Sequence, residues 1–149
     1  MPRKDNSITG AAGVLYAAAI LSLRGMIALP TIKNVAAYDI LVSSSDGERH
    51  ANIQVKASAD CVKFWPISTL EKIKTADTDF YVLLRCKAKE QFEGFMLTGA
   101  EMKIELEAYR DWYIAKGRPQ SVEKFPLCLD IKDDVKRNRW KQQWDTWTL

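Results

Sequence analysis

Two apolar runs separated by an Asp-Gly pair constrain the fold of this chain more than any other feature of its sequence. Residues 37–43 (AYDILVS) and 50–57 (HANIQVKA) are rich in apolar and β-branched residues, which is typical of β-strands. Asp46-Gly47 lies between them and favours a two-residue hairpin loop. With that loop, Ser45 faces Glu48 and the register of the whole hairpin follows.

Three polar side chains interrupt this hairpin. The register places Asp39 opposite Gln54, and Lys56 projects from the same face two residues further along, whereas Ile53 and Val55 point into the core. The Asp39 carboxylate, the Gln54 amide and the Val55 carbonyl are hard oxygen ligands that suit Mg²⁺. A lysine beside such an ion stabilises charge that develops on a scissile phosphate. The alternative is an Asp–Lys pair on an exposed sheet face with a solvated glutamine.

The rest of the chain reads as helices and strands without linkers or repeats. An uncharged stretch, residues 6–23, predicts a helix that is buried on most sides and closed by Gly25. The other expected elements are strands at 26–30, 79–87 and 92–98, a short helix at 66–75, and an amphipathic helix at 99–117 that ends at Gly117. This order predicts a single α/β domain, with a mixed sheet flanked by helices.

The N-terminus also fits a second interpretation. Arg3 and Lys4 precede the apolar stretch, as in a secretory signal, but no clear small-residue cleavage site follows. Thr9, Gly10 and Gly13 interrupt the run, which is shorter than the about 20 apolar residues of a membrane span. We therefore expect a cytoplasmic protein without a membrane anchor, and an exported or membrane-attached protein is the alternative.

Composition narrows the classes of site. Cys61, Cys86 and Cys128 are scattered and accompany a single histidine, His50, which argues against a disulfide framework and a structural zinc site. We expect reduced cysteines in the core, and no catalytic role for His50. A net charge of +3 is compatible with a nucleic-acid partner.

The C-terminal tail, from about residue 120 to 149, is rich in tryptophan. Trp140, Trp144 and Trp147 are expected to pack onto the body, because exposed tryptophan clusters are costly. The run at 132–141 (KDDVKRNRWK) contains five bases and two acids. It is read either as a solvated, frayed tail or as a surface that binds a nucleic-acid backbone.

The combination of Asp39 with Gln54-Val55-Lys56 resembles the PD-(D/E)xK nuclease superfamily, which has the restriction-endonuclease-like fold and includes Holliday-junction resolvases and type IV restriction enzymes. A preceding helix that ends in LSLRG (21–25) and the phrase IQVKAS (53–58) are similar to small members of that family. The resemblance covers roughly residues 8–98, and the TWTL ending is a weaker match.

This resemblance implies a core of order αβββαβ and hydrolysis of DNA phosphodiesters with Mg²⁺ or Mn²⁺. Asp39 and the Val55 carbonyl would bind the metal, Gln54 would bind it or position a water, and Lys56 would stabilise the transition state. Contacts with DNA are expected from four further residues: Lys33, Asn34, Ser58 and Lys63. Resolvases act as dimers, so a homodimer formed through the tail or the last helix is included in the expectation.

One position departs from the family pattern. Many small members have a glutamate on the first helix, and Val14, after Gly13, stands there instead. No acid lies between Asp5 and Asp39, so the predicted metal site has one carboxylate and one neutral amide. The alternative function is therefore a catalytically degenerate protein of the same fold that binds nucleic acid or a protein partner without cleavage.

Overall fold

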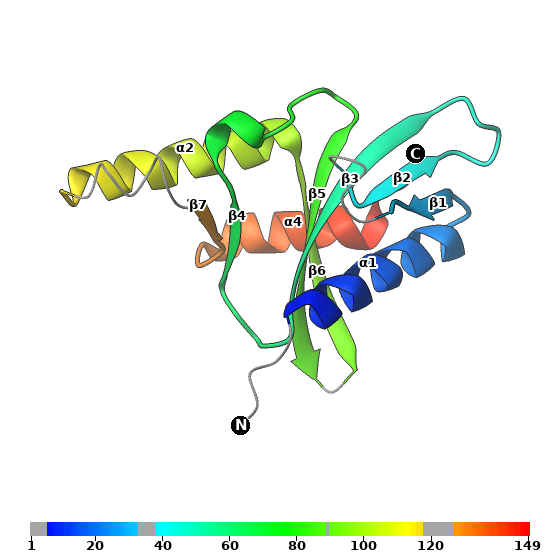
Figure 1. The fold of residues 1–149 in the computed structure, drawn as a ribbon, viewed down its shortest axis with the longest axis horizontal. Coiled ribbons are helices and arrows are strands. Elements are labelled where there is room, and N and C mark those ends of the chain that lie inside the picture. Colours follow the sequence, from blue (N-terminus) through cyan, green and yellow to red (C-terminus); the bar gives the residue numbers. More distant parts are fainter. Residues whose placement is uncertain (1–5, 33–37, 89, 118–126) are drawn as a thin grey trace.

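The chain folds around a five-stranded mixed sheet with helices on its two faces (Figure 1). The computed structural model describes residues 6–32, 38–88, 90–117 and 127–149. The elements, in chain order, are α1 (Asn6–Leu23), β1 (Ile27–Pro30), β2 (Ile40–Ser43), β3 (His50–Ser58), β4 (Phe64–Ser68), the 3-10 turn η1 (Leu70–Lys72), β5 (Asp79–Ala88), β6 (Gln91–Thr98), α2 (Gly99–Ala115), β7 (Leu127–Asp130) and α4 (Asp134–Thr146). The central sheet has the order β1-β2-β3-β5-β6, and β4 pairs with β7 separately. The predicted mixed α/β fold class is confirmed.

The hairpin of β2 and β3 has the predicted register but a different loop. Ile40 pairs with Ile53 and Ser43 with His50, as the Asp46-Gly47 signal predicts. The Ser44 N–H donates to the Arg49 carbonyl at 2.9 Å, so the loop contains residues 45–48 and the predicted two-residue loop is wrong. The register survives because the longer loop extends the expected one by a residue on each side.

Helix α1 covers one face of the sheet. Ala17 and Leu21 are completely buried against a cluster that includes Ile53 and Val55, which confirms that these two β3 residues point into the core. Gly13 faces β3 so closely that an added Cβ would lie 2.4 Å from the Ala57 Cβ. After the helix, Gly25 adopts φ +85°, the left-handed conformation that glycine tolerates and that ends many helices.

Helix α2 and the β4–β7 ribbon lie against the opposite face. Thr98 caps α2 with a complete capping box, because its side chain accepts from the Glu101 N–H and Glu101 accepts from the Thr98 N–H. Met102 and Leu106 of α2 pack with Leu83 and Phe95 of the sheet. The helix ends at Ala115, two residues before the predicted Gly117, which has φ +76°.

The connection between the parallel strands β3 and β5 differs from the expected αβββαβ core. A helix is predicted at 66–75, but this segment contains most of β4 and then the single turn η1. Trp65 and Ile67 alternate with exposed residues along β4, and this period of two fits a strand. The Trp65 ring nitrogen donates to the Leu84 carbonyl at 3.1 Å, so the tertiary contact holds the strand against β5.

The C-terminal tail forms a strand and a helix that the sequence pattern did not predict. Its tryptophans pack onto the body as expected, with Trp140 and Trp144 buried on α4 and Trp147 against the core beneath α1. Gly94 of β6 makes room for the Trp144 ring, because an added Cβ would lie 2.3 Å from the ring nitrogen. From residue 127 on, the tail is therefore an integral layer of the fold.

Two of the three cysteines differ from the predicted core positions. Cys61 is exposed and Cys86 is half-buried on β5, and both are free thiols. The Cys128 side chain lies outside the described part. His50 is exposed beside the hairpin loop, away from Gln54 and Lys56 at the other end of β3.

Helices long and apolar enough to cross a membrane are absent among the described residues.

Candidate active site at the edge of β3

The carboxylate of Asp39 lies against the backbone of β3. Its Oδ2 atom accepts a hydrogen bond of 2.7 Å from the Val55 N–H, and its own N–H donates to the Ile53 carbonyl at 2.9 Å. Strand β2 begins only at Ile40, so beyond that point no strand of the described residues pairs with this edge of β3, and the carboxylate lies there instead. The structure therefore brings Asp39 to the residue between Gln54 and Lys56.

The same edge offers a second oxygen. In a strand, the N–H and C=O of one residue point to the same side, because paired residues exchange both hydrogen bonds. The Val55 carbonyl therefore faces the side on which its N–H meets Asp39. A carboxylate and a carbonyl at one strand edge are ligands of the kind that a hard divalent cation prefers.

Gln54 and Lys56 project from the face of the sheet opposite α1. Their neighbours on β5 are Tyr81 and Leu83, which belong to the core beneath α2. Both polar side chains are half-buried, and within the described part of the chain neither makes a hydrogen bond or an ion pair. A half-buried amide and ammonium can bind a ligand where their hydrogen-bonding capacity is not used by the protein.

A polar cluster that sequence reasoning missed lies beside this face. Asp79 is 4% exposed, and its carboxylate accepts from the Asn52 amide at 3.2 Å and from the Ala76 N–H at 3.0 Å. The Tyr38 hydroxyl also bonds to it, and burial together with this bond raises the pKa of Tyr38. Asp79 thereby connects the start of β5 to β3 and to the residue before Asp39.

Tyr81 completes the cluster next to Gln54. Burial raises the pKa of Tyr81 to about 12, with a smaller contribution from the charge of Asp79, and a hydrogen bond with the Lys74 backbone opposes the shift. The tyrosine is therefore neutral at physiological pH. The signal for this cluster is an acid at the first position of an otherwise apolar strand, DFYVLLRCK, but sequence alone gives no partner for it.

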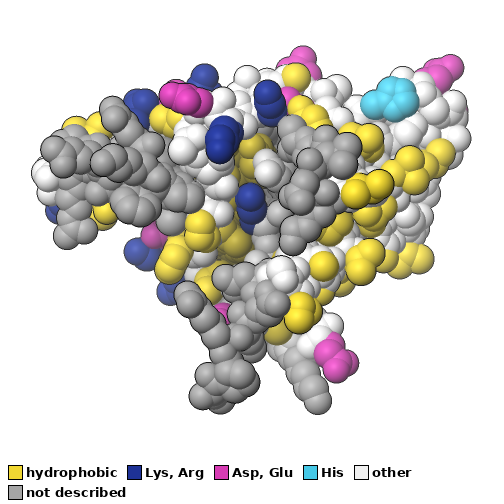
Figure 2. Space-filling model, in the orientation of Figure 1, with side chains coloured by type: hydrophobic (Ala, Val, Ile, Leu, Met, Phe, Trp, Pro, Cys, Tyr) yellow, Lys and Arg dark blue, Asp and Glu magenta, His cyan; other side chains and the backbone are white. Residues whose placement is uncertain are grey.

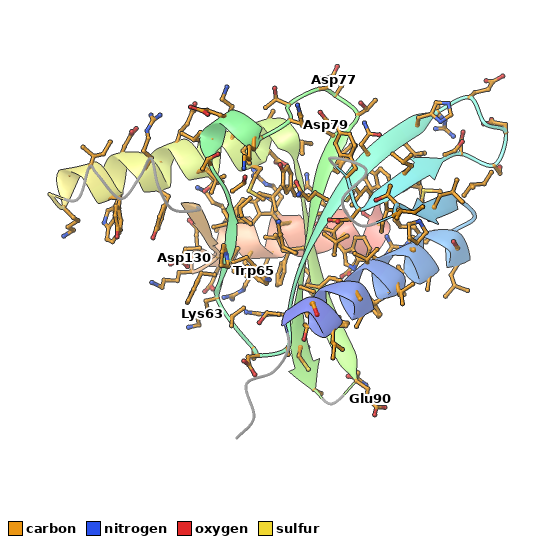
Figure 3. All side chains as sticks on the ribbon, in the orientation of Figure 1. Lys63, Trp65, Asp77, Asp79, Glu90 and Asp130 are labelled. Atoms are coloured by element: carbon orange, nitrogen blue, oxygen red, sulfur yellow. The ribbon has the colours of Figure 1, made fainter. Side chains whose placement is uncertain are left out.

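The predicted DNA-contacting residues are only partly assembled around Asp39. Lys33 and Asn34 lie outside the described residues. Ser58 is at the end of β3, where its hydroxyl accepts from the Asp60 N–H at 3.3 Å. Lys63 is exposed at the start of β4, on the side of the molecule where Asp130 lies (Figure 3).

Val14, the position of the missing acid, packs among apolar side chains. It contacts the core cluster between α1 and the sheet, which contains Ile53 and Val55. Val14 therefore lies on the other side of the sheet from Gln54 and Lys56, among apolar side chains, where an apolar residue fits. Groups of three or more His, Cys, Asp or Glu that could hold a metal are also absent from the described residues.

The basic run at 132–141 is largely neutralised within the molecule. Helix α4 contains most of it, and each of its five bases contacts an acid: Lys132 with Asp130, Lys136 with Glu105, Arg137 with Asp134, Arg139 with Glu101, and Lys141 with Asp145. A basic side chain held by a carboxylate has less charge to offer to a phosphate. On the face shown in Figure 2, other lysines and arginines gather between α2 and the β2–β3 hairpin.

Comparison with solved structures finds a similar mixed α/β fold. One similar structure is described as a bacterial homing endonuclease, I-Ssp6803I, with a TM-score of 0.51 and 17% sequence identity. The match covers 95% of this chain and 90% of that one, so it extends over the whole fold. At this identity the likeness establishes the fold and leaves the chemistry to the residues.

No family model matches the sequence, and no curated protein matches it either.

Proposed function

We propose that this protein is a metal-dependent DNA endonuclease of the PD-(D/E)xK type. The observation that carries the proposal is the 2.7 Å hydrogen bond from the Val55 N–H to Asp39, because it fixes a carboxylate beside the Gln54-Val55-Lys56 segment. The shared fold with a homing endonuclease supports the same conclusion. DNA is accordingly the proposed substrate.

Each residue of the candidate site has a distinct role in this proposal. Asp39 and the Val55 carbonyl would hold Mg²⁺ or Mn²⁺, and the Gln54 amide would hold the ion or orient a water molecule. When bound, the ion supplies Lewis acidity and lowers the pKa of a coordinated water. Lys56 donates hydrogen bonds to the phosphate oxygens, where negative charge grows as water adds to phosphorus. Its half-buried position strengthens that interaction relative to one in bulk water.

These candidate ligands suit a divalent ion whose remaining ligands come from the substrate. One carboxylate and two neutral oxygens carry little negative charge, and Mg²⁺ sites commonly take their remaining ligands from water and phosphate. We therefore expect weak metal binding in the free protein and tighter binding when DNA is present.

A cleavage assay tests the proposal. Wild-type protein is incubated with linear, four-way-branched and base-modified DNA, with Mg²⁺, Mn²⁺ or a chelator. Lys56→Ala should reduce the cleavage rate by about a hundredfold or more, as loss of a transition-state donor does elsewhere. Lys103→Ala is the matched control, since this lysine is exposed on α2 and is not part of the candidate site.

A second function follows if the wild type cuts none of these substrates. The single carboxylate and the apolar Val14 are the observations that favour it. In that case the protein binds DNA without cleavage, and affinity measured by fluorescence anisotropy should fall linearly on a log–log plot against salt concentration. Absence of both cleavage and salt-dependent binding would contradict both functions.

A further inference from the structure

The backbone of Asp39 is held by Thr31, the residue that follows β1. The Thr31 N–H donates to the Asp39 carbonyl at 2.9 Å, and the Thr31 hydroxyl donates to the Tyr38 carbonyl at 2.5 Å. These two carbonyls belong to the peptide groups on either side of the Asp39 α-carbon. Thr31 therefore binds both of the peptide groups that set the direction in which the carboxylate leaves the chain.

Thr31 reaches this position because the pairing of β1 with β2 continues beyond the two strands. Pro30 pairs with Ile40, so the next antiparallel pair in the same register is Thr31 with Asp39. The hydrogen bond from the Thr31 N–H extends the ladder by this pair. A β-branched residue suits such an extended segment, and threonine adds a hydroxyl donor that valine lacks.

Asp39 needs this support because its backbone departs from a regular strand. In a regular strand, the N–H and C=O of one residue point to the same neighbouring strand. The Asp39 N–H donates to Ile53 on β3, whereas the Asp39 carbonyl faces Thr31 on the β1 side. The chain therefore bends at Asp39, and this bend brings the carboxylate to the Val55 N–H, 2.7 Å away.

A second contact holds the residue before Asp39 from the side of β5. The Tyr38 hydroxyl bonds to the buried carboxylate of Asp79. This contact is made at the far end of the tyrosine side chain, so it fixes the ring but leaves the Tyr38 peptide group free to rotate. The Thr31 hydroxyl binds that peptide group directly.

We infer that Thr31 is a positioning residue of the candidate site. Its hydroxyl and its N–H fix the two peptide groups around Asp39, and they thereby hold the carboxylate against Val55. The role of Thr31 in cleavage rests on the proposed function, whereas its effect on the position of Asp39 does not. Misplacement of a catalytic group by about 1 Å can reduce a rate by about a hundredfold.

Thr31→Val tests the inference, because valine keeps the branched shape and the backbone N–H but removes the hydroxyl. Hydrogen exchange followed by NMR reports on the Val55 N–H, which donates to Asp39. This N–H should exchange about three- to tenfold faster in Thr31→Val than in wild type, the change that loss of one hydrogen bond gives. Thr31→Ser keeps a hydroxyl and should exchange at close to the wild-type rate.

Two controls separate a local effect from general destabilisation. The Asn52 N–H lies on the other edge of β3, where it donates to the Thr78 carbonyl at 2.8 Å, and its exchange rate should be equal in all variants. Thr146→Val removes a comparable bond on α4, from a threonine hydroxyl to the Gln142 carbonyl at 2.8 Å. This variant should leave the exchange of the Val55 N–H unchanged.

Cleavage kinetics give a second readout. A displaced Asp39 carboxylate affects the chemical step and not the contacts that bind DNA, so Thr31→Val should lower kcat by about tenfold or more and leave KM unchanged. Thr31→Ser should recover most of the lost rate, and Thr146→Val should cut at the wild-type rate.

Three results would overturn the inference. They are an unchanged exchange rate at Val55 in Thr31→Val, an equal acceleration at Val55 and Asn52, and an active wild type whose kcat Thr31→Val leaves unchanged. Equal acceleration would mean that the hydroxyl supports the whole fold and not the position of Asp39. A wild type that cuts none of the DNA substrates contradicts the proposed function alone, because the exchange measurement does not depend on cleavage.

Discussion

The Oδ2 atom of Asp39 and the backbone nitrogen of Val55 are 2.7 Å apart, and this hydrogen bond closes the edge of β3 where β2 has not yet begun. A charged acceptor makes such a bond about twice as strong as a neutral one. The bond therefore has two effects, since it orients the carboxylate at the candidate site and satisfies an N–H that has lost its strand partner.

Removal of that carboxylate should destabilise the fold. Asp39→Ala leaves the Val55 N–H without this acceptor, and we expect a loss of about 1.5–3 kcal/mol in the free energy of unfolding, the usual range for hydrogen bonds to charged groups. Gln54→Ala is the control, and it should change stability by less than about 0.5 kcal/mol because its side chain makes no hydrogen bond within the described residues. Urea unfolding of both variants measures the difference, and equal losses would contradict the structural role of Asp39.

Two glycines of α1 should respond to alanine in opposite directions. Gly13→Ala places a Cβ 2.4 Å from the Ala57 Cβ, so the helix must move away from β3, at a cost of about 1–3 kcal/mol. Gly10→Ala meets no atom within 4 Å and should stabilise the protein by about 0.5–1 kcal/mol through helix propensity. Thermal melts of the two variants measure these effects. If Gly13→Ala stabilises the protein as well, α1 does not approach β3 this closely.

Two acids near the start of β5 should differ sharply in their contribution to stability. Figure 3 shows Asp77 and Asp79 close to the same turn. Asp79 is 4% exposed and accepts hydrogen bonds from Asn52 and Ala76, whereas Asp77 is exposed. Asp79→Ala removes the buried carboxylate that accepts both bonds and should cost about 2–3 kcal/mol in unfolding free energy. Asp77→Ala should cost less than about 0.5 kcal/mol. Chemical denaturation measures both, and similar costs would contradict the buried cluster.

Alkaline pH should destabilise the protein through Tyr81. Its pKa is about 12 in the folded protein and about 10 in an unfolded chain. The folded state therefore keeps a proton that the unfolded state loses, so the stability from Tyr81 is complete below about pH 10 and is lost as pH rises toward about 12. A shift of two pKa units limits the full loss to about 2.7 kcal/mol.

Tyr81→Phe isolates this effect, because other groups titrate equally in both proteins. The unfolding free energy of wild type should fall more steeply than that of the variant between about pH 10 and 12. The measurement is urea unfolding at a series of pH values. Parallel pH dependence in the two proteins would show that Tyr81 keeps its ordinary pKa in the fold.

Local sequence patterns were sufficient to predict an element where the segment contains its own turn or capping residues or a regular side-chain period. Asp46-Gly47 and the alternation of β3 predicted the hairpin register, and Gly25 predicted the end of α1. The same alternation predicted that Asp39 lies near Gln54, but it gave no partner for the carboxylate, because that partner is the backbone N–H of Val55 on another strand. The side-chain cluster of Asp79, Tyr38 and Tyr81 was missed for the same reason, since its members are distant in sequence.

The sequence by itself determined the mixed α/β class, the strand pairing of the hairpin and the nearness of Asp39 to Gln54 and Lys56, because these follow from turn chemistry and side-chain period over a few residues. Only the tertiary structure decided that the tail forms α4. The sequence of this segment is mostly polar, and the helix is stabilised by the burial of Trp140 and Trp144 against β6 and its neighbours. It also decided that one side of an uncharged helix stays in solvent, because exposure depends on which surfaces the sheet can cover.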